Sequence, residues 1–171
     1  MTNVKNTISN HNRHLLESKK KNNDGCNCRS KDECPLDGNC LAKCIVYKAA
    51  ITVTDDGETK EYIGMTAGNF KTRYNNHRKS LNIPRYSNET ELSKYAWKLK
   101  QSNRPYTIKW SVLTHASSYT AGSSSCNLCL EEKICLIKSD RTKTLNKRSE
   151  LFSRCRHRNS FSARNYKRTR I

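Results

Sequence analysis

The chain has 171 residues, enough for one domain of ordinary size with appended segments. Its 33 lysines and arginines outnumber its 15 aspartates and glutamates, and the resulting net charge of +18 favours a polyanionic partner, nucleic acid before an acidic membrane surface. No apolar run approaches the roughly 20 residues that span a bilayer, and the first residues lack the apolar centre of a secretory signal. We therefore expect no membrane partner, and a cytosolic or nuclear protein with reduced thiols.

The composition changes along the chain and divides it into four segments. Residues 1–25 are polar and basic and are expected to form a linker. Residues 26–44 are rich in cysteine, residues 45–153 carry the apolar periodicity of a folded domain, and residues 154–171 are basic without any acidic residue. We interpret the basic tail as a segment that contacts the backbone of DNA or RNA, although a solvated tail has the same composition.

A β-hairpin is predicted directly after the cysteine-rich segment. The run IVYKAAITV (45–53) is rich in β-branched residues, DDG (55–57) is a turn signal, and TKEYIG (59–64) returns as a second strand. The spacing of apolar residues then predicts a helix from the N-cap Asn69 until the chain reaches Pro84.

A second helix is predicted over residues 88–100, a strand over 106–116 and a third helix over 126–138. The apolar face of the third helix is expected to consist of Cys126, Leu130, Ile134 and Ile137. These elements together predict a small α+β domain with basic ends.

Several polar side chains follow one another along the chain in an order that resembles that of the GIY-YIG nucleases. Tyrosines lie on both hairpin strands, arginine and histidine follow one turn apart on the next helix, and glutamate and asparagine come later: Tyr47, Tyr62, Arg73, His77, Glu132 and Asn146. The stretches CPLDGNCL, YIG, RYNNH, CNLCLEEK and LNKR, in this order, are similar to the endonuclease domain of Penelope-like retroelements, and the first residues are similar to the linker after their reverse transcriptase. The resemblance implies a small GIY-YIG nuclease fold, a three-stranded antiparallel sheet flanked by helices and preceded by a zinc-binding segment.

The resemblance also implies a role for each of these side chains. Tyr47 would act as general base or orient the attacking water, and Arg73 would bind the scissile phosphate with its planar donors. Tyr62 and His77 would complete the hydrogen-bond network. In isolation each of these residues is more typical of ordinary strand, helix or surface positions, so the hypothesis depends on the ordered set.

The later helix would hold the catalytic metal. Glu132 would bind Mg²⁺ or Mn²⁺, hard cations that prefer carboxylate oxygen, and Asn146 would position a strand or a metal-bound water. Helix geometry does not choose between Glu131 and Glu132; we prefer Glu132 because the family pattern places a lysine after the glutamate, as Lys133 does here.

The nine cysteines suggest structural zinc, because reduced thiols are soft metal ligands. One group precedes the first predicted strand and another group surrounds the last helix, and the zinc candidates are Cys26, Cys28, Cys34, Cys40, Cys126, Cys129, Cys155 and His157. Packing of Cys126 in the core is an alternative for the second group, and a cross-connected arrangement remains open. Cys44 and Cys135 are expected to be ordinary core or near-core residues.

The leading hypothesis is a metal-dependent DNA endonuclease that nicks target DNA and so provides a 3′ end for reverse transcription. The implied partners are DNA, element RNA and a reverse transcriptase in cis or in trans, and the implied location is the nucleus. A zinc-stabilised nucleic-acid-binding module with a decayed active site, or a basic RNA-binding protein, would share the charge and the cysteines.

Overall fold

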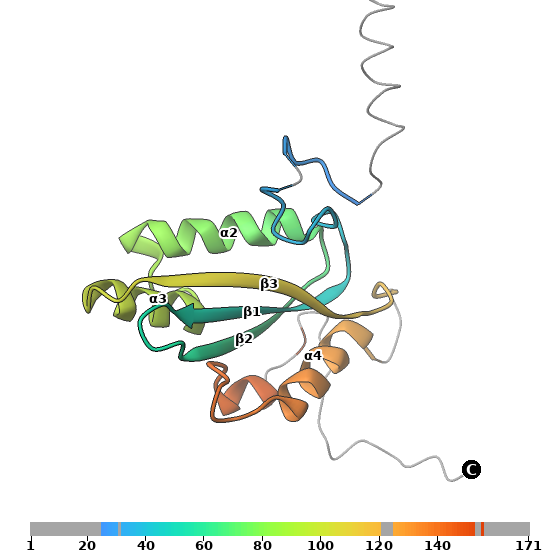
Figure 1. Ribbon diagram of the computed structural model, residues 1–171. Helices are drawn as coiled ribbons and strands as arrows, with labels where there is room; N and C mark the ends of the chain where they lie inside the picture. The colour runs from blue at the N-terminus through green and yellow to red at the C-terminus, as the bar shows by residue number, and fades with distance from the viewer. Residues whose placement is uncertain (1–24, 31, 121–124, 153–154, 156–171) are drawn as a thin grey trace, which may run out of the picture. The chain divides into compact units, whose positions relative to one another are not determined.

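The computed structural model describes residues 25–30, 32–120, 125–152 and 155 (Figure 1). The predicted basic linker and basic tail therefore lie outside the described residues, apart from their inner ends at Gly25 and Cys155. The chain divides into two compact units, Met1–Leu41 and Ala42–Ile171. Within the described ranges, none of the helices has the length and apolar character that crossing a membrane requires.

The second unit contains one antiparallel sheet of three strands. The strands are β1 (Ile45–Val53), β2 (Thr59–Thr66) and β3 (Tyr106–His115), in the order β2-β1-β3. The predicted hairpin of β1 and β2 is confirmed, and Gly57 in its turn adopts φ +71°, a conformation that side-chain-bearing residues rarely adopt. β1 is the central strand, while β2 and β3 are the edges.

Three α-helices accompany this sheet among the described residues: α2 (Phe70–Asn82), α3 (Glu91–Gln101) and α4 (Asn127–Lys138), with 3-10 turns η1 (Pro84–Tyr86) and η2 (Arg148–Phe152). The predicted cap of α2 is confirmed, because the Asn69 side chain accepts a hydrogen bond from the backbone N–H of Thr72. The α+β class with a three-stranded antiparallel sheet and helices is likewise confirmed.

The sheet lies between two layers of side chains. Alternate residues of β1 point to opposite faces. On one face Tyr47 packs against Phe70 of α2, with ring centroids 5.1 Å apart. On the other face Val46 and Ile63 pack in a core cluster with Leu128 of α4. In Figure 1 α2 and α4 accordingly appear on either side of the three strands.

The buried face of α4 differs from the predicted one. Its buried residues are Leu128, Cys129, Lys133 and Leu136. The side chain of Ile137, expected in the core, is 64% exposed. Of the four residues of the predicted face only Cys126 is buried, because α4 carries apolar residues around most of its circumference and its contact with Val46 and Ile63, rather than its periodicity, selects the buried side.

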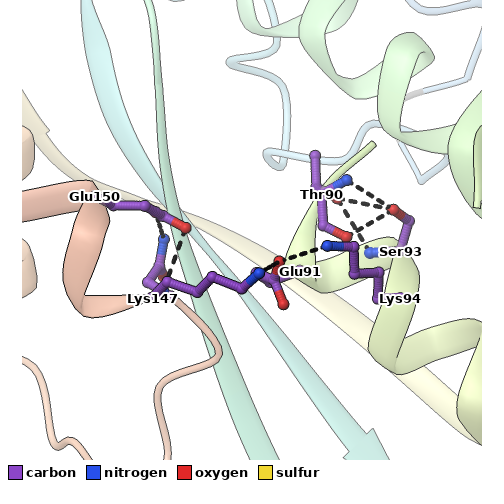
Figure 2. A network of polar contacts seen from close by, with 7 residues as sticks. Thr90, Glu91, Ser93, Lys94, Lys147 and Glu150 are labelled. Carbon is purple, nitrogen blue, oxygen red and sulfur yellow. Dashed lines mark hydrogen bonds and ion pairs between the residues drawn. The ribbon is translucent and has the colours of Figure 1, made fainter. Parts of the chain in front are cut away.

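A polar network joins the start of α3 to the segment before η2. Figure 2 shows the Glu91 carboxylate in ion pairs with the ammonium groups of Lys94, at 2.8 Å, and Lys147, at 3.1 Å. Beside it, Thr90 and Ser93 form the capping box that begins α3. The ion pairs are partly exposed and are expected to contribute only about 0–1 kcal/mol each.

Candidate active site

A groove of about 620 Å³ follows the outer edge of β2. The end of β2 contributes Tyr62, the first turns of α2 contribute Arg73 and Asn76, and the first turns of α4 contribute Cys129 and Glu132. Helices from opposite faces of the sheet thus present a cation and a carboxylate to one space. Three of the six predicted catalytic residues, Tyr62, Arg73 and Glu132, therefore line one space.

Behind the groove, Tyr47 is fully buried and holds two neighbouring side chains. Its hydroxyl oxygen accepts a hydrogen bond from Arg73 Nε at 2.9 Å and lies 2.8 Å from His77 Nε2. Burial, together with the charge of Arg73, lowers the pKa of His77 to about 3. His77 is therefore neutral at pH 7, and because the Tyr47 oxygen already accepts from Arg73, the tautomer that fits is the one with its proton on Nδ1, in which Nε2 accepts a hydrogen bond from the Tyr47 hydroxyl.

The second tyrosine is closer to the groove. Tyr62 lines it and remains 8% exposed, whereas Tyr47 is 0% exposed. Burial raises the pKa of both phenols, and the positive charge of Arg73 opposes that rise. Burial alone would lower the pKa of Arg73, but interactions with the two phenols raise it, so the guanidinium is held between both tyrosines.

On α4 the structure distinguishes the two glutamates. Glu132 lines the groove and Glu131 does not. Burial is the main cause that raises the pKa of Glu132 to about 7, the negative charge of Glu150 adds to it, and Lys133 and Arg73 act in the opposite direction. A carboxyl group in such a position favours a nearby cation, because a positive charge compensates the cost of burying the anion.

Asn146, expected to position a strand or a metal-bound water, does not line this groove. Its Oδ1 accepts the backbone N–H of Ile63 at 2.7 Å, and its Nδ2 donates to the carbonyl of Ile63 at 2.8 Å and to Glu150 at 2.6 Å. The side-chain amide thus pairs with the edge of β2 as another strand would. The adjacent backbone does the same, since Glu61 exchanges hydrogen bonds with Lys143 and Leu145, both at 2.8 Å. Both amide protons of Asn146 are used in this role.

Gly64 is a site residue that was absent from the predicted set. A Cβ atom at this position would lie 2.6 Å from the hydroxyl oxygen and 2.8 Å from Cζ of Tyr47. Tyr47 and Gly64 are paired across β1 and β2, so the tyrosine ring passes over the glycine to reach Arg73. The YIG stretch itself contains the signal, because a glycine inside a strand often marks a close approach.

The first unit contains four converging cysteines. The Sγ atoms of Cys26, Cys28, Cys34 and Cys40 all lie within 4.8 Å of one another. Individual pairs are 3.5 Å apart for Cys26 and Cys34 and 3.6 Å apart for Cys28 and Cys40. Four thiols at these distances could hold a structural metal ion such as zinc, which takes four sulfur ligands in a tetrahedron.

A second group of cysteines lies in the other unit. Cys126, Cys129 and Cys155 are all buried, and their Sγ atoms also lie within 4.8 Å of one another. This group too could hold a structural metal. His157, predicted as a ligand here, lies outside the described residues, while Cys44 and Cys135 are half-buried and belong to neither group.

No family model, curated protein or solved structure matches the chain. The side chains that meet in the groove are therefore the basis for assigning a function. They are a guanidinium, a phenol and a buried carboxyl group, and behind them a second phenol is hydrogen-bonded to a neutral histidine.

Proposed function

We propose that the protein is a metal-dependent DNA endonuclease of the GIY-YIG type that nicks one strand by phosphodiester hydrolysis. One observation carries the proposal: Arg73, Tyr62 and Glu132 come from three different elements and line one groove, with Tyr47 and His77 directly behind them. Phosphodiester hydrolysis needs a base near water, cations near the phosphoryl oxygens and a site for a divalent ion. These residue types supply each of those needs.

Glu132 would hold Mg²⁺ or Mn²⁺. Both ions prefer carboxylate oxygen, and burial, which raises the pKa of this carboxyl group to about 7, disfavours its charged form unless a cation lies nearby. When bound, the ion would supply positive charge to the phosphoryl oxygens and an acidified water. Glu131 lacks access to the groove and is not a candidate for this role.

Arg73 would bind the scissile phosphate. Its Nε–H is used by the hydroxyl of Tyr47, which fixes the plane of the guanidinium. The terminal N–H groups remain to serve Tyr62 and a phosphate oxygen, and a planar donor set suits such an oxyanion better than a lysine would.

The geometry favours Tyr62 over Tyr47 as the phenol that meets the attacking water. The resemblance implied that Tyr47 acts as general base or orients the attacking water, but this hydroxyl is enclosed between Arg73 and His77 and has no exposed surface. Tyr62 reaches the groove; burial raises the pKa of its phenol, and the positive charge of Arg73 opposes that rise. Tyr47 would then orient Arg73, and its hydroxyl would donate a hydrogen bond to His77.

The expected substrate is DNA, and the wider setting is that of a Penelope-like retroelement. The net charge of +18 supports a polyanionic partner. In that setting the nick would provide the 3′ end for reverse transcription in the nucleus, with element RNA and a reverse transcriptase as further partners. These last points derive from the sequence motifs alone.

A plasmid assay tests the proposal. Supercoiled DNA is incubated with the protein and Mg²⁺, Mn²⁺ or a chelator, and the nicked circle is quantified. We expect metal-dependent nicking that falls roughly 100-fold or more in Glu132→Gln, as is usual for loss of a catalytic group, while the matched variant Glu131→Gln keeps the parent rate.

Two outcomes would contradict the assignment. If the folded parent protein binds DNA but does not nick it with either metal, the chain is a nucleic-acid-binding module with a decayed site. If Glu131→Gln and Glu132→Gln lose activity equally, the groove does not identify the metal-binding carboxylate.

A further inference from the structure

The cysteine cluster at the start of α4 connects two segments that are distant in the sequence. Cys126 and Cys129 belong to the cap and first turn of α4, and Cys155 follows η2. The side chains are 1%, 4% and 6% exposed, and Cys129 Sγ lies 3.2 Å from Cys155 Sγ. All three sulfur atoms lie within 4.8 Å of one another.

Core packing alone does not explain this arrangement. A buried thiol can act as a small apolar side chain, and Cys135 on the same helix does so, packing against the cluster from a half-buried position. Cys126, Cys129 and Cys155 differ from it because their sulfur atoms converge on one another. A disulfide would use two of the three and leave the third without a partner.

We propose that these three thiolates bind one zinc ion, separate from any ion held by Cys26, Cys28, Cys34 and Cys40, and that this ion attaches α4 to the chain after η2. Zinc–sulfur bonds of about 2.3 Å in a tetrahedron place the sulfur atoms about 3.8 Å apart. In the cluster, Cys129 Sγ and Cys155 Sγ are 3.2 Å apart and none of the three separations exceeds 4.8 Å, so only small movements would bring the sulfur atoms to that distance. Three thiolates leave one position for a fourth ligand.

The ion would act beside a second attachment of the same two segments. The buried ammonium of Lys133 donates hydrogen bonds to the backbone carbonyls of Glu150, at 3.0 Å, and Leu151, at 2.9 Å. Zinc at Cys129 and these bonds at Lys133 would hold both sides of Glu132, which stands between them on α4. The effect on Glu132 as a catalytic residue rests on the proposed function, but the metal site itself does not.

Zinc content of the full chain tests the proposal without any activity measurement. Elemental analysis compares the parent protein with Cys129→Ser and with the matched variant Cys135→Ser, after circular dichroism has shown that each is folded. We expect Cys129→Ser to contain one zinc fewer per chain than the parent and Cys135→Ser to contain as much as the parent. Equal zinc content in all three would overturn the proposal.

A second variant keeps the test decisive if Cys129→Ser fails to fold. Full-length protein carrying both Cys34→Ser and Cys40→Ser lacks two ligands of the other cluster, and we expect it to retain one zinc per chain. Replacement of that zinc by Co²⁺ should give the thiolate-to-metal absorption and strong visible bands of a tetrahedral site. No retained metal would overturn the proposal, whereas a parent protein that contains this zinc but does not nick DNA would count against the nuclease assignment alone.

Discussion

Replacement of Gly64 by alanine tests how the tyrosine network is built. The added Cβ would meet the Tyr47 hydroxyl oxygen at 2.6 Å and Cζ at 2.8 Å, both far inside normal contact. The ring has little room to retreat, because Phe70 and Trp110 lie 5.1 and 5.9 Å from its centroid. Any movement of the hydroxyl also disturbs its hydrogen bond to Arg73.

The size of the effect follows from two opposing contributions. Forcing one methyl group into a packed region costs about 1–3 kcal/mol. Alanine in place of glycine also reduces the freedom of the unfolded chain, which stabilises the folded state by about 0.4–1 kcal/mol. We therefore expect Gly64→Ala to lower the free energy of unfolding by about 1–2 kcal/mol.

Gly68 provides a matched control near the same groove. A Cβ at Gly68 would meet no atom within 4 Å, and its φ is not positive, so Gly68→Ala should keep or slightly increase stability. Urea unfolding of the parent and both variants measures the difference, and plasmid nicking should fall in Gly64→Ala only. Equal stability of the two alanine variants would refute the close approach of Tyr47 to Gly64.

Two further variants separate structural from chemical roles. Asn146→Ala removes the hydrogen bonds to Ile63 and Glu150 and should cost about 1–3 kcal/mol in urea unfolding, while the nicking rate per folded molecule stays unchanged; loss of nicking at full stability would contradict this role. The imidazole of His77 takes up a proton below about pH 6.5 in the unfolded chain and only below about pH 3 in the folded protein. The folded state therefore loses stability as the pH falls through this window. Between pH 7 and 5 this loss is about 2 kcal/mol and should be absent from His77→Gln; the same pH dependence in both proteins would contradict a buried neutral His77.

The sequence predicted those features that depend on local patterns. Asn69 was recognisable as a helix cap, and the turn at Gly57 followed from its DDG tripeptide. The spacing of Arg73 and His77, four residues apart, placed both on one helix face, and both contact the hydroxyl of Tyr47. In each case the neighbours along the chain determine the geometry.

Features that depend on distant contacts were missed. α4 offers apolar residues on several sides, and its packing against Val46 and Ile63 leaves Ile137 exposed. Asn146 had no local signal for its actual role, because the amide pairs with the backbone of Ile63, 83 residues earlier in the chain. Side chains that replace a missing strand can be identified only once the edge they cover is known.

The groove owes its position to the unequal covering of β2. Lys143, Leu145 and Asn146 satisfy the outer edge of this strand at Glu61 and Ile63, and the groove lies along its later residues, from Gly64 to Thr66. An edge strand must be covered or otherwise protected from association. Among the described residues, the groove thus follows the part of the β2 edge that these segments leave uncovered.

The sheet determines how far the guanidinium of Arg73 lies from the carboxyl group of Glu132, because the two residues are held from its opposite faces. Arg73 is positioned by a core on one face, through Tyr47, whereas Glu132 is carried by α4, which packs on the other face against Val46. α4 has few large apolar side chains on its buried side, where Leu128 and Leu136 are accompanied by a cysteine and a lysine. A metal ion at the cysteine cluster would compensate for that small apolar contact, because it stabilises only the arrangement in which its ligands meet.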